Sequence, residues 1–140
     1  MKITISRIAP LLIFIPILIL RCTPPNLCDP MQNTGIGPIE KLDLVPVNTN
    51  VAAEGQVLYD QLCRVCHNEI NQMEGPAHWG IINRRTPEWI MNMMLNPTEM
   101  AQEDPIAKIL AERVNGVEMP DMNLSEEEAL KILEYFRTLQ

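Results

Sequence analysis

The sequence predicts an all-α domain of about four helices, preceded by an apolar leader and a proline-rich segment. Apolar residues recur at three- and four-residue steps through the second half of the chain, and several of these runs begin with a helix-capping pattern. No convincing strand run is found there. We therefore divide the 140 residues into a signal peptide or membrane anchor (1–21), a tether (22–50) and a domain (51–140).

The leader is an apolar run from Ile8 to Leu20, preceded only by the charges of Lys2 and Arg7. Its 13 residues match the apolar core of a signal peptide, about 7–15 residues, better than a membrane span of about 20. Counted from Ile3, the run reaches 18 residues, the lower edge of a spanning helix, so an uncleaved anchor stays open. Either interpretation implies export to the periplasm.

Cys22 directly follows the leader and precedes a polar, proline-rich stretch, which resembles the lipidation site of bacterial lipoproteins. Arg21 departs from that family, which has a small residue at this position. Two interpretations stay open: a lipid anchor, or a free thiol or disulfide with Cys28, which an oxidising compartment permits. The prolines and glycines of the tether break regular structure, so this segment is expected to hold the domain away from a membrane.

The negative charge of the chain limits the classes of partner that it can bind. The formal net charge is −7, and residues 1–21 hold three positive charges and no negative one, so residues 22–140 carry −10. Such a surface repels phosphates, which argues against nucleic acid as a partner. It favours either steering toward a redox partner protein with a basic docking patch, or simple solubility.

The first two helices are set by their apolar spacing and their ends. Residues from Val51 to Leu62 repeat at helical spacing and lead into Cys63. The second helix begins with Thr86 as the capping residue, a proline at its first position and an acid near the positive end of the helix dipole. It is expected to stop at Pro97.

The third and fourth helices carry equally clear start signals. Asp104-Pro105 repeats the start of the second helix, and the glycine at Gly116 ends the third. Ser125 and Glu128 form a capping box, after which apolar residues repeat at helical spacing to Leu139.

The run from Cys63 to His67 has the form C-x-x-C-H, the attachment signature of a c-type haem. The two thiols have the spacing that joins two vinyl groups of a porphyrin by thioether bonds, with Cys66 placing His67 beneath the iron. A structural zinc site would need a second ligand pair, and a thioredoxin-like redox pair would need a βαβ pattern. The sequence shows neither, so we expect one covalent haem c with its iron.

The iron needs a second axial ligand, and the chain has nine methionines. Met119, stiffened by a following proline in the loop before the last helix, is the expected ligand, with Met122 as the alternative. The methionines on or just after the second helix are expected to be packing residues: Met91, Met93, Met94 and Met100. His78 is expected to be a solvated loop histidine rather than a ligand.

The segment from residue 55 to residue 139 resembles the class I mono-haem cytochromes c. The resemblance is carried by Gly55, Tyr59, Cys63, Cys66, His67, Gly75, Pro76, Met119, Pro120, the capped segment 124–128 and Tyr135. It implies the class I cytochrome c fold, with the first and last helices crossing closely at Gly55 against Tyr135 or Ile132. It also implies a hydrogen bond from Nδ1 of His67 to the carbonyl of Pro76, and Met119 as the iron ligand.

A narrower resemblance is carried by residues 84–93 and by Asp104-Pro105, which are similar to small cytochromes found with nitrous-oxide reduction systems. It implies a copper reductase or its electron supply as the partner. Arg84 and Arg85 are candidates to bind haem propionates, with solvated charges as the alternative. Trp79 and Trp89 are candidates to line the haem edge and donate to a propionate, with core packing as the alternative.

Together these features indicate an exported one-electron carrier of a bacterial respiratory chain, either free in the periplasm or anchored to a membrane through a lipid on Cys22 or an uncleaved leader. No residue is expected to act as an acid, base or nucleophile, so the chain is interpreted as an electron-transfer protein, alone or as a subunit of a larger oxidoreductase. The alternative is a haem-based sensor or peroxidase-like protein with an exchangeable sixth ligand.

Overall fold

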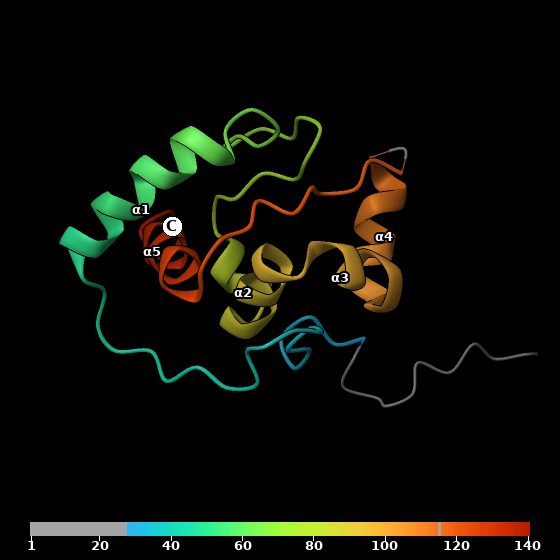
Figure 1. Ribbon diagram of the computed structural model, residues 1–140, viewed down its shortest axis with the longest axis horizontal. Helices are drawn as coiled ribbons and strands as arrows, with labels where there is room; N and C mark the ends of the chain where they lie inside the picture. The colour runs from blue at the N-terminus through green and yellow to red at the C-terminus, as the bar shows by residue number, and fades with distance from the viewer. Residues whose placement is uncertain (1–27, 115) are drawn as a thin grey trace, which may run out of the picture.

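Five α-helices and no strand make up the computed structural model, which describes residues 28–114 and 116–140 (Figure 1). The helices are α1 (Thr49–Leu62), α2 (Pro87–Leu95), α3 (Pro97–Glu103), α4 (Pro105–Arg113) and α5 (Glu126–Phe136), with a single 3₁₀ turn at Ile81–Asn83. The all-α prediction is therefore confirmed, and the described residues contain no helix long and apolar enough to cross a membrane.

The predicted helix starts are confirmed by their capping hydrogen bonds. Oγ1 of Thr86 accepts from the amide of Trp89 at 3.1 Å, and Ser125 and Glu128 form both halves of a capping box. The expectation of about four helices missed α3, because Pro97 ends α2 and at once supplies the first residue of α3.

Helices α1 and α5 cross at Gly55. A Cβ atom at this glycine would lie 1.8 Å from the backbone oxygen of Lys131 and 3.0 Å from the backbone nitrogen of Ile132. The close crossing is thus confirmed, and its contact is with backbone rather than with the side chain of Tyr135. The crossing sets the position of the loop that follows α1, where the haem motif lies.

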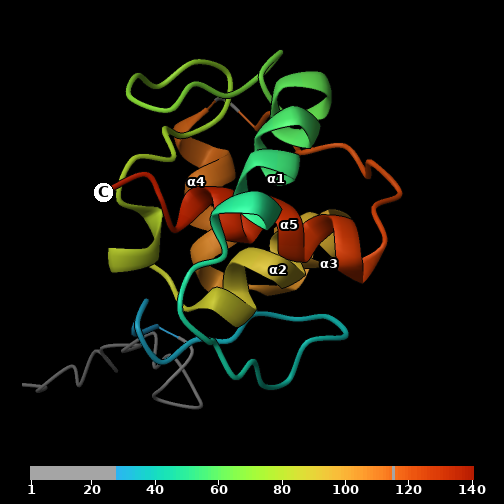
Figure 2. The ribbon, with the colours of Figure 1, turned by 90° about the vertical axis from the view of Figure 1, so that its left-hand side faces the viewer.

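Residues 33–48, which we call the strap, contain no helix or strand and end where α1 begins, in keeping with their prolines. They nevertheless lie against the helices, and Figures 1 and 2 show them running beneath α2. Asn92 of α2 is the main clamp: its Oδ1 accepts from the amide of Ile39, and its Nδ2 donates to the carbonyls of Thr34 and Ile39, each at 2.9 Å.

The strap is also fixed at its far end, where the amide of Asn48 donates to Oε2 of Glu134 at 3.1 Å. This part of the expected tether therefore does not hang freely from the domain. The leader, Arg21 and Cys22 lie outside the described residues, so cleavage, lipidation and the pairing of Cys22 stay predictions, as does the proposed boundary at residue 50.

Candidate haem site

The two cysteines of the motif lie in the tight turn that ends α1. The amides of Cys66 and His67 both donate to the carbonyl of Cys63, at 3.2 and 3.0 Å. Cys63 is buried and Cys66 is partly exposed. Burial raises the pKa of Cys63 to about 11, and burial together with a hydrogen bond to Glu74 raises that of Cys66. Before they are joined to a haem, both thiols are therefore less acidic than an ordinary cysteine.

His67 is held in one orientation and one tautomer. Its Nδ1 lies 3.0 Å from the carbonyl oxygen of Pro76. A carbonyl only accepts, so Nδ1 carries the proton and Nε2 keeps its lone pair for a metal. Burial also lowers the pKa of His67, which favours the neutral ring that ligation needs.

Gly75 explains why the ring of His67 fits where it does. A Cβ atom at this position would lie 2.2 Å from Cε1 and 2.5 Å from Nδ1 of His67. Only a glycine therefore lets the backbone before Pro76 pass so close to the imidazole. The expected hydrogen bond to Pro76 depends on this close approach.

His78 is not the solvated loop histidine that the sequence led us to expect. It is only 7 % exposed, its ring stacks on that of His67, and its Nδ1 lies 3.3 Å from the hydroxyl of Tyr59. Burial, followed by the charges of His67 and Arg84, lowers the pKa of His78 to about 3. The sequence did hold a signal: a residue two positions after Pro76 must lie near His67 if Pro76 binds that imidazole.

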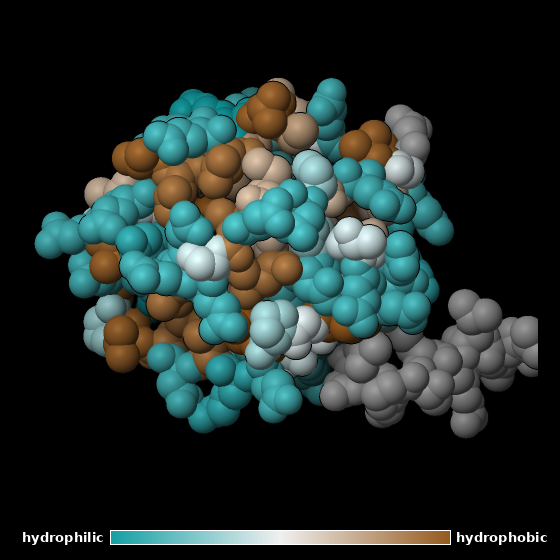
Figure 3. Space-filling view, in the orientation of Figure 1, coloured by the Kyte–Doolittle hydropathy of each residue, from teal (hydrophilic) through white to brown (hydrophobic). Residues whose placement is uncertain are grey.

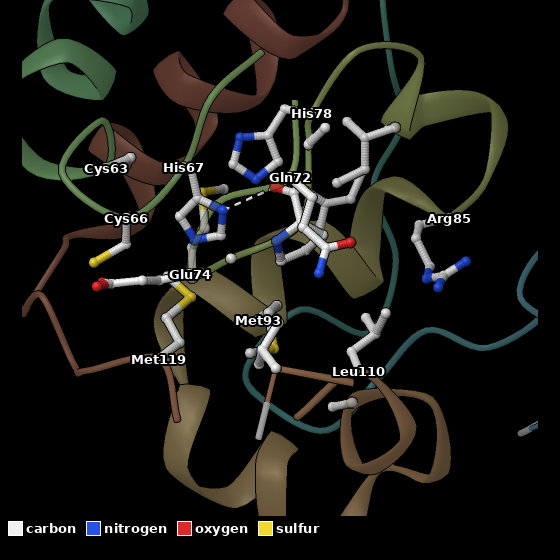
Figure 4. Close-up of a pocket in the computed structure, with 18 of the residues that line it drawn as sticks. Cys63, Cys66, His67, Gln72, Glu74, His78, Arg85, Met93, Leu110 and Met119 are labelled. Carbon is white, nitrogen blue, oxygen red and sulfur yellow. Dashed lines mark hydrogen bonds between the residues drawn. The ribbon is translucent and has the colours of Figure 1, made fainter. Parts of the chain in front are cut away.

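These residues form one side of a cavity of about 1020 Å³. This is at the upper end of the roughly 300–1,000 Å³ typical of ligand and cofactor sites. In Figure 4, His67 and His78 lie on one side of the cavity, Met93 and Met119 lie across it, and Arg85 lies toward another edge. The cavity thus presents an imidazole on one wall and a thioether on another.

Five methionines line the cavity: Met31, Met93, Met94, Met119 and Met122. Both expected ligand candidates, Met119 and Met122, are therefore at the site. Met93 and Met94 were expected to be packing residues, yet they form part of the cavity wall as well as contacting the core. The sequence could not separate these roles, because the same residues of α2 contact the core and line the cavity.

Three arginines also line the cavity: Arg84, Arg85 and Arg113. Nη2 of Arg84 donates to the carbonyl of Ala77 at 2.9 Å, whereas Nε of Arg85 is buried without a hydrogen-bond partner. Burial, followed by the charge of Arg84, lowers the pKa of Arg85. Sequence analysis missed Arg113, which lies in the last turn of α4.

The two tryptophans differ in their position relative to the cavity. Trp89 is buried and its ring lines the cavity, and its Nε1 donates to Oδ1 of Asp104 at 3.1 Å. Trp79 is half exposed and is not among the residues that line the cavity. The burial of Trp89 and its bond to Asp104 also agree with the alternative interpretation, which is core packing.

The site fits a haem on several independent grounds. A cysteine pair lies beside an imidazole with a free Nε2, a thioether lies across the cavity, and a buried arginine N–H lacks a partner. An all-α fold with this site defines a protein that carries a covalently attached haem.

Residues 52–140 match the family model for cytochrome c, and the chain belongs to this family. Its cofactor is therefore covalent haem c with iron, as the motif predicted.

The structure is similar to that of cytochrome c from Rhodothermus marinus, with 39 % sequence identity and a TM-score of 0.71 over 74 % of this chain and 89 % of that one. An engineered form of that cytochrome is 38 % identical, with a TM-score of 0.71 over 74 % of this chain and 90 % of that one. The cytochrome c domain of a Pseudomonas putida protein is 27 % identical, with a TM-score of 0.53 over 60 % of this chain and 85 % of that domain. No curated protein sequence matches the chain.

Proposed function

We propose that the protein carries one electron at a time on a single haem c, with His67 and Met119 as the axial ligands. The observation that carries this proposal is the placement of a neutral imidazole and a thioether on different walls of one cavity beside the two cysteines. When bound, haem iron supplies the one-electron redox couple. The protein contributes the ligands, their orientation and the exclusion of water.

The hydrogen bond from His67 to Pro76 supports this role in two ways. It fixes the tautomer, and it makes Nε2 a stronger donor to iron because a carbonyl stabilises positive charge on the ring. The neighbouring buried rings of His78 and Tyr59 keep the ligand side of the cavity out of water.

The arginines of the cavity support a site for the haem propionates. Arg85 has a buried N–H without a partner, and Arg84 and Arg113 add positive charge to the same cavity. A carboxylate placed there would gain charge-assisted hydrogen bonds. We therefore assign Arg85 to a propionate, with Arg84 and Arg113 as supporting charges.

The rim of the cavity supports a docking surface for a redox partner protein. Four apolar side chains that line the cavity are strongly exposed: Val65 (78 %), Ile70 (69 %), Met31 (52 %) and Val117 (51 %). Glu74 and Glu118 line the same cavity. Apolar and polar residues alternate over the face shown in Figure 3. An apolar centre with acidic neighbours suits a partner with an apolar contact and a basic rim.

We place this carrier outside the cytoplasm, in a bacterial respiratory chain, alone or as a subunit of a larger oxidoreductase. The support is the family, whose members are typically exported, and the apolar leader. The narrower likeness to cytochromes of nitrous-oxide reduction systems stays a prediction.

The test compares Met119→Ala with the matched variant Met122→Ala in the haem-loaded protein. Met119→Ala should lose the weak far-red band of oxidised methionine-ligated haem, become high-spin and bind carbon monoxide when reduced. Met122→Ala should keep the band. The reverse result would assign Met122 as the ligand. A high-spin spectrum in the wild-type protein would instead support the sensor or peroxidase-like function, with an exchangeable sixth position.

A further inference from the structure

The strap begins at a junction that ties together the starts of two helices. Asn33 is 2 % exposed, and its Nδ2 donates to Oδ2 of Asp104 at 2.6 Å. Its carbonyl accepts from Oγ1 of Thr86, also at 2.6 Å. Thr86 caps α2 and Asp104 caps α4, so one strap residue holds both helix starts in a fixed relation. Asn33 lies outside the residues that the family model matches.

Asp104 is the centre of this junction. It is fully buried, and its Oδ1 accepts from the amides of Ile106 and Ala107, at 3.0 and 2.8 Å, and from Nε1 of Trp89. Helix capping needs only the two backbone amides. The bonds to Trp89 and Asn33 are additional, and they fix an aromatic side chain of the cavity wall.

Trp89 in turn supports the arginine that faces the cavity. Cζ of Arg85 lies 5.3 Å from the centroid of the Trp89 ring, within the distance of a cation–π contact. Both side chains line the cavity, and Nε of Arg85 is the buried N–H that lacks a partner. A contact with a ring face holds a guanidinium only if the ring itself cannot turn.

We propose that Asp104 is a positioning residue of the haem site. It fixes the ring of Trp89, and this ring holds Arg85 toward a haem propionate. The hydrogen bond from Asn33 to Asp104 fixes the carboxylate in turn. The proposal rests on the proposed function, because it assigns a role toward the bound haem. A guanidinium fixed near the haem favours the reduced iron, since reduction lowers the positive charge of the iron. Loss of its position should therefore lower the reduction potential.

The test uses Trp89→Phe, which keeps a ring face for Arg85 but removes the N–H that binds Asp104. In haem-loaded protein, the reduction potential should fall while the covalent haem and the far-red methionine band are kept. In an Arg85→Gln background the same change should have no further effect. Asn33→Ala, which leaves the cavity lining unchanged, should act in the same direction and also depend on Arg85. Gln32→Ala, an exposed neighbour, should have no effect.

The role of Asp104 would be overturned if Trp89→Phe and Asn33→Ala shifted the reduction potential equally with and without Arg85. It would also be overturned if neither variant shifted the potential. Proton exchange at Nε of Arg85, followed by NMR, gives a second measurement, and it should become faster in Trp89→Phe and in Asn33→Ala. Unchanged exchange in both variants would also overturn the proposal. A wild-type protein without covalent haem would overturn the proposed function itself, which is a separate outcome.

Discussion

The imidazole of His78 lies on that of His67, with the ring centroids 4.5 Å apart and the ring planes 23° apart. His78 is held there by Tyr59, whose hydroxyl lies 3.3 Å from its Nδ1. His78 and Tyr59 are both buried beside the proposed iron ligand. Replacing either residue would leave the polar atom of the other without this hydrogen-bond partner.

We therefore expect His78→Leu and Tyr59→Phe each to lower the free energy of unfolding by about 1–2 kcal/mol, because each leaves a buried polar group unpaired. The double variant should cost less than the sum of the two, since both polar partners are then gone. Denaturant unfolding of the four proteins measures this coupling. Strictly additive losses would show that the hydrogen bond contributes nothing.

Gly55→Ala should destabilise the protein by roughly 3 kcal/mol, because a methyl group there meets the backbone of α5 and overpacking is costly. Gln56→Ala, at the next and exposed position of α1, is the control and should change stability by less than about 0.5 kcal/mol. Thermal and denaturant unfolding measure both variants. Equal effects would show that the helices separate at little cost.

Tyr135 gives a pH dependence with a defined sign. Burial, followed by its hydrogen bond to Glu69, raises the pKa of Tyr135 from 10.0 to about 12. The folded state therefore holds the phenolic proton more tightly, and this stabilisation is complete below pH 10. Above pH 10 the unfolded chain loses its proton first, so the stabilisation falls until the folded phenol also ionises near pH 12.

The stability advantage of wild type over Tyr135→Phe should accordingly shrink between pH 10 and pH 12. The decline should approach about 1.4 kcal/mol per pH unit. Unfolding curves of the two proteins at a series of alkaline pH values measure this difference. A difference that stays constant with pH would mean that Tyr135 ionises equally in the folded and unfolded states.

Asn92→Ala should release the strap, because it removes three hydrogen bonds to strap backbone groups. The expected loss is roughly 3 kcal/mol, together with faster proteolytic cleavage of the chain between residues 33 and 48. Asn71→Ala, in an exposed loop, serves as the control. Cleavage at the wild-type rate would show that the strap is held by other contacts.

The helix starts could be predicted because each capping residue acts within its own short window. Oγ1 of Thr86 reaches the amide of Trp89, three residues on, and Ser125 reaches Glu128 in the same way. The tautomer-fixing contact of His67 with Pro76 followed from the family resemblance. In all of these, sequence neighbours are also neighbours in space.

The features that the sequence did not predict depend on contacts between distant parts of the chain. Pro76 places His78 near His67, but His78 is also covered by Phe136 of α5, with the ring centroids 4.5 Å apart, and no residue near His78 in sequence indicates that contact. The strap is held by Asn92, more than fifty residues further along the chain. Its proline-rich composition correctly excluded helix and strand, but composition does not reveal whether a segment without regular structure is packed or free.

Because Asn33 is bound to Asp104, less free chain is left between the domain and any membrane anchor near the N-terminus. A chain spans at most about 3.3–3.6 Å per residue, so residues 22–50 as a free tether would allow a reach of about 100 Å. With the chain fixed from Asn33 onward, an anchor at Cys22 would leave at most about 40 Å, whatever conformation those residues adopt. In a lipidated form, Asn33 and the domain fixed to it would therefore stay near the membrane surface, which favours redox partners that lie close to that surface.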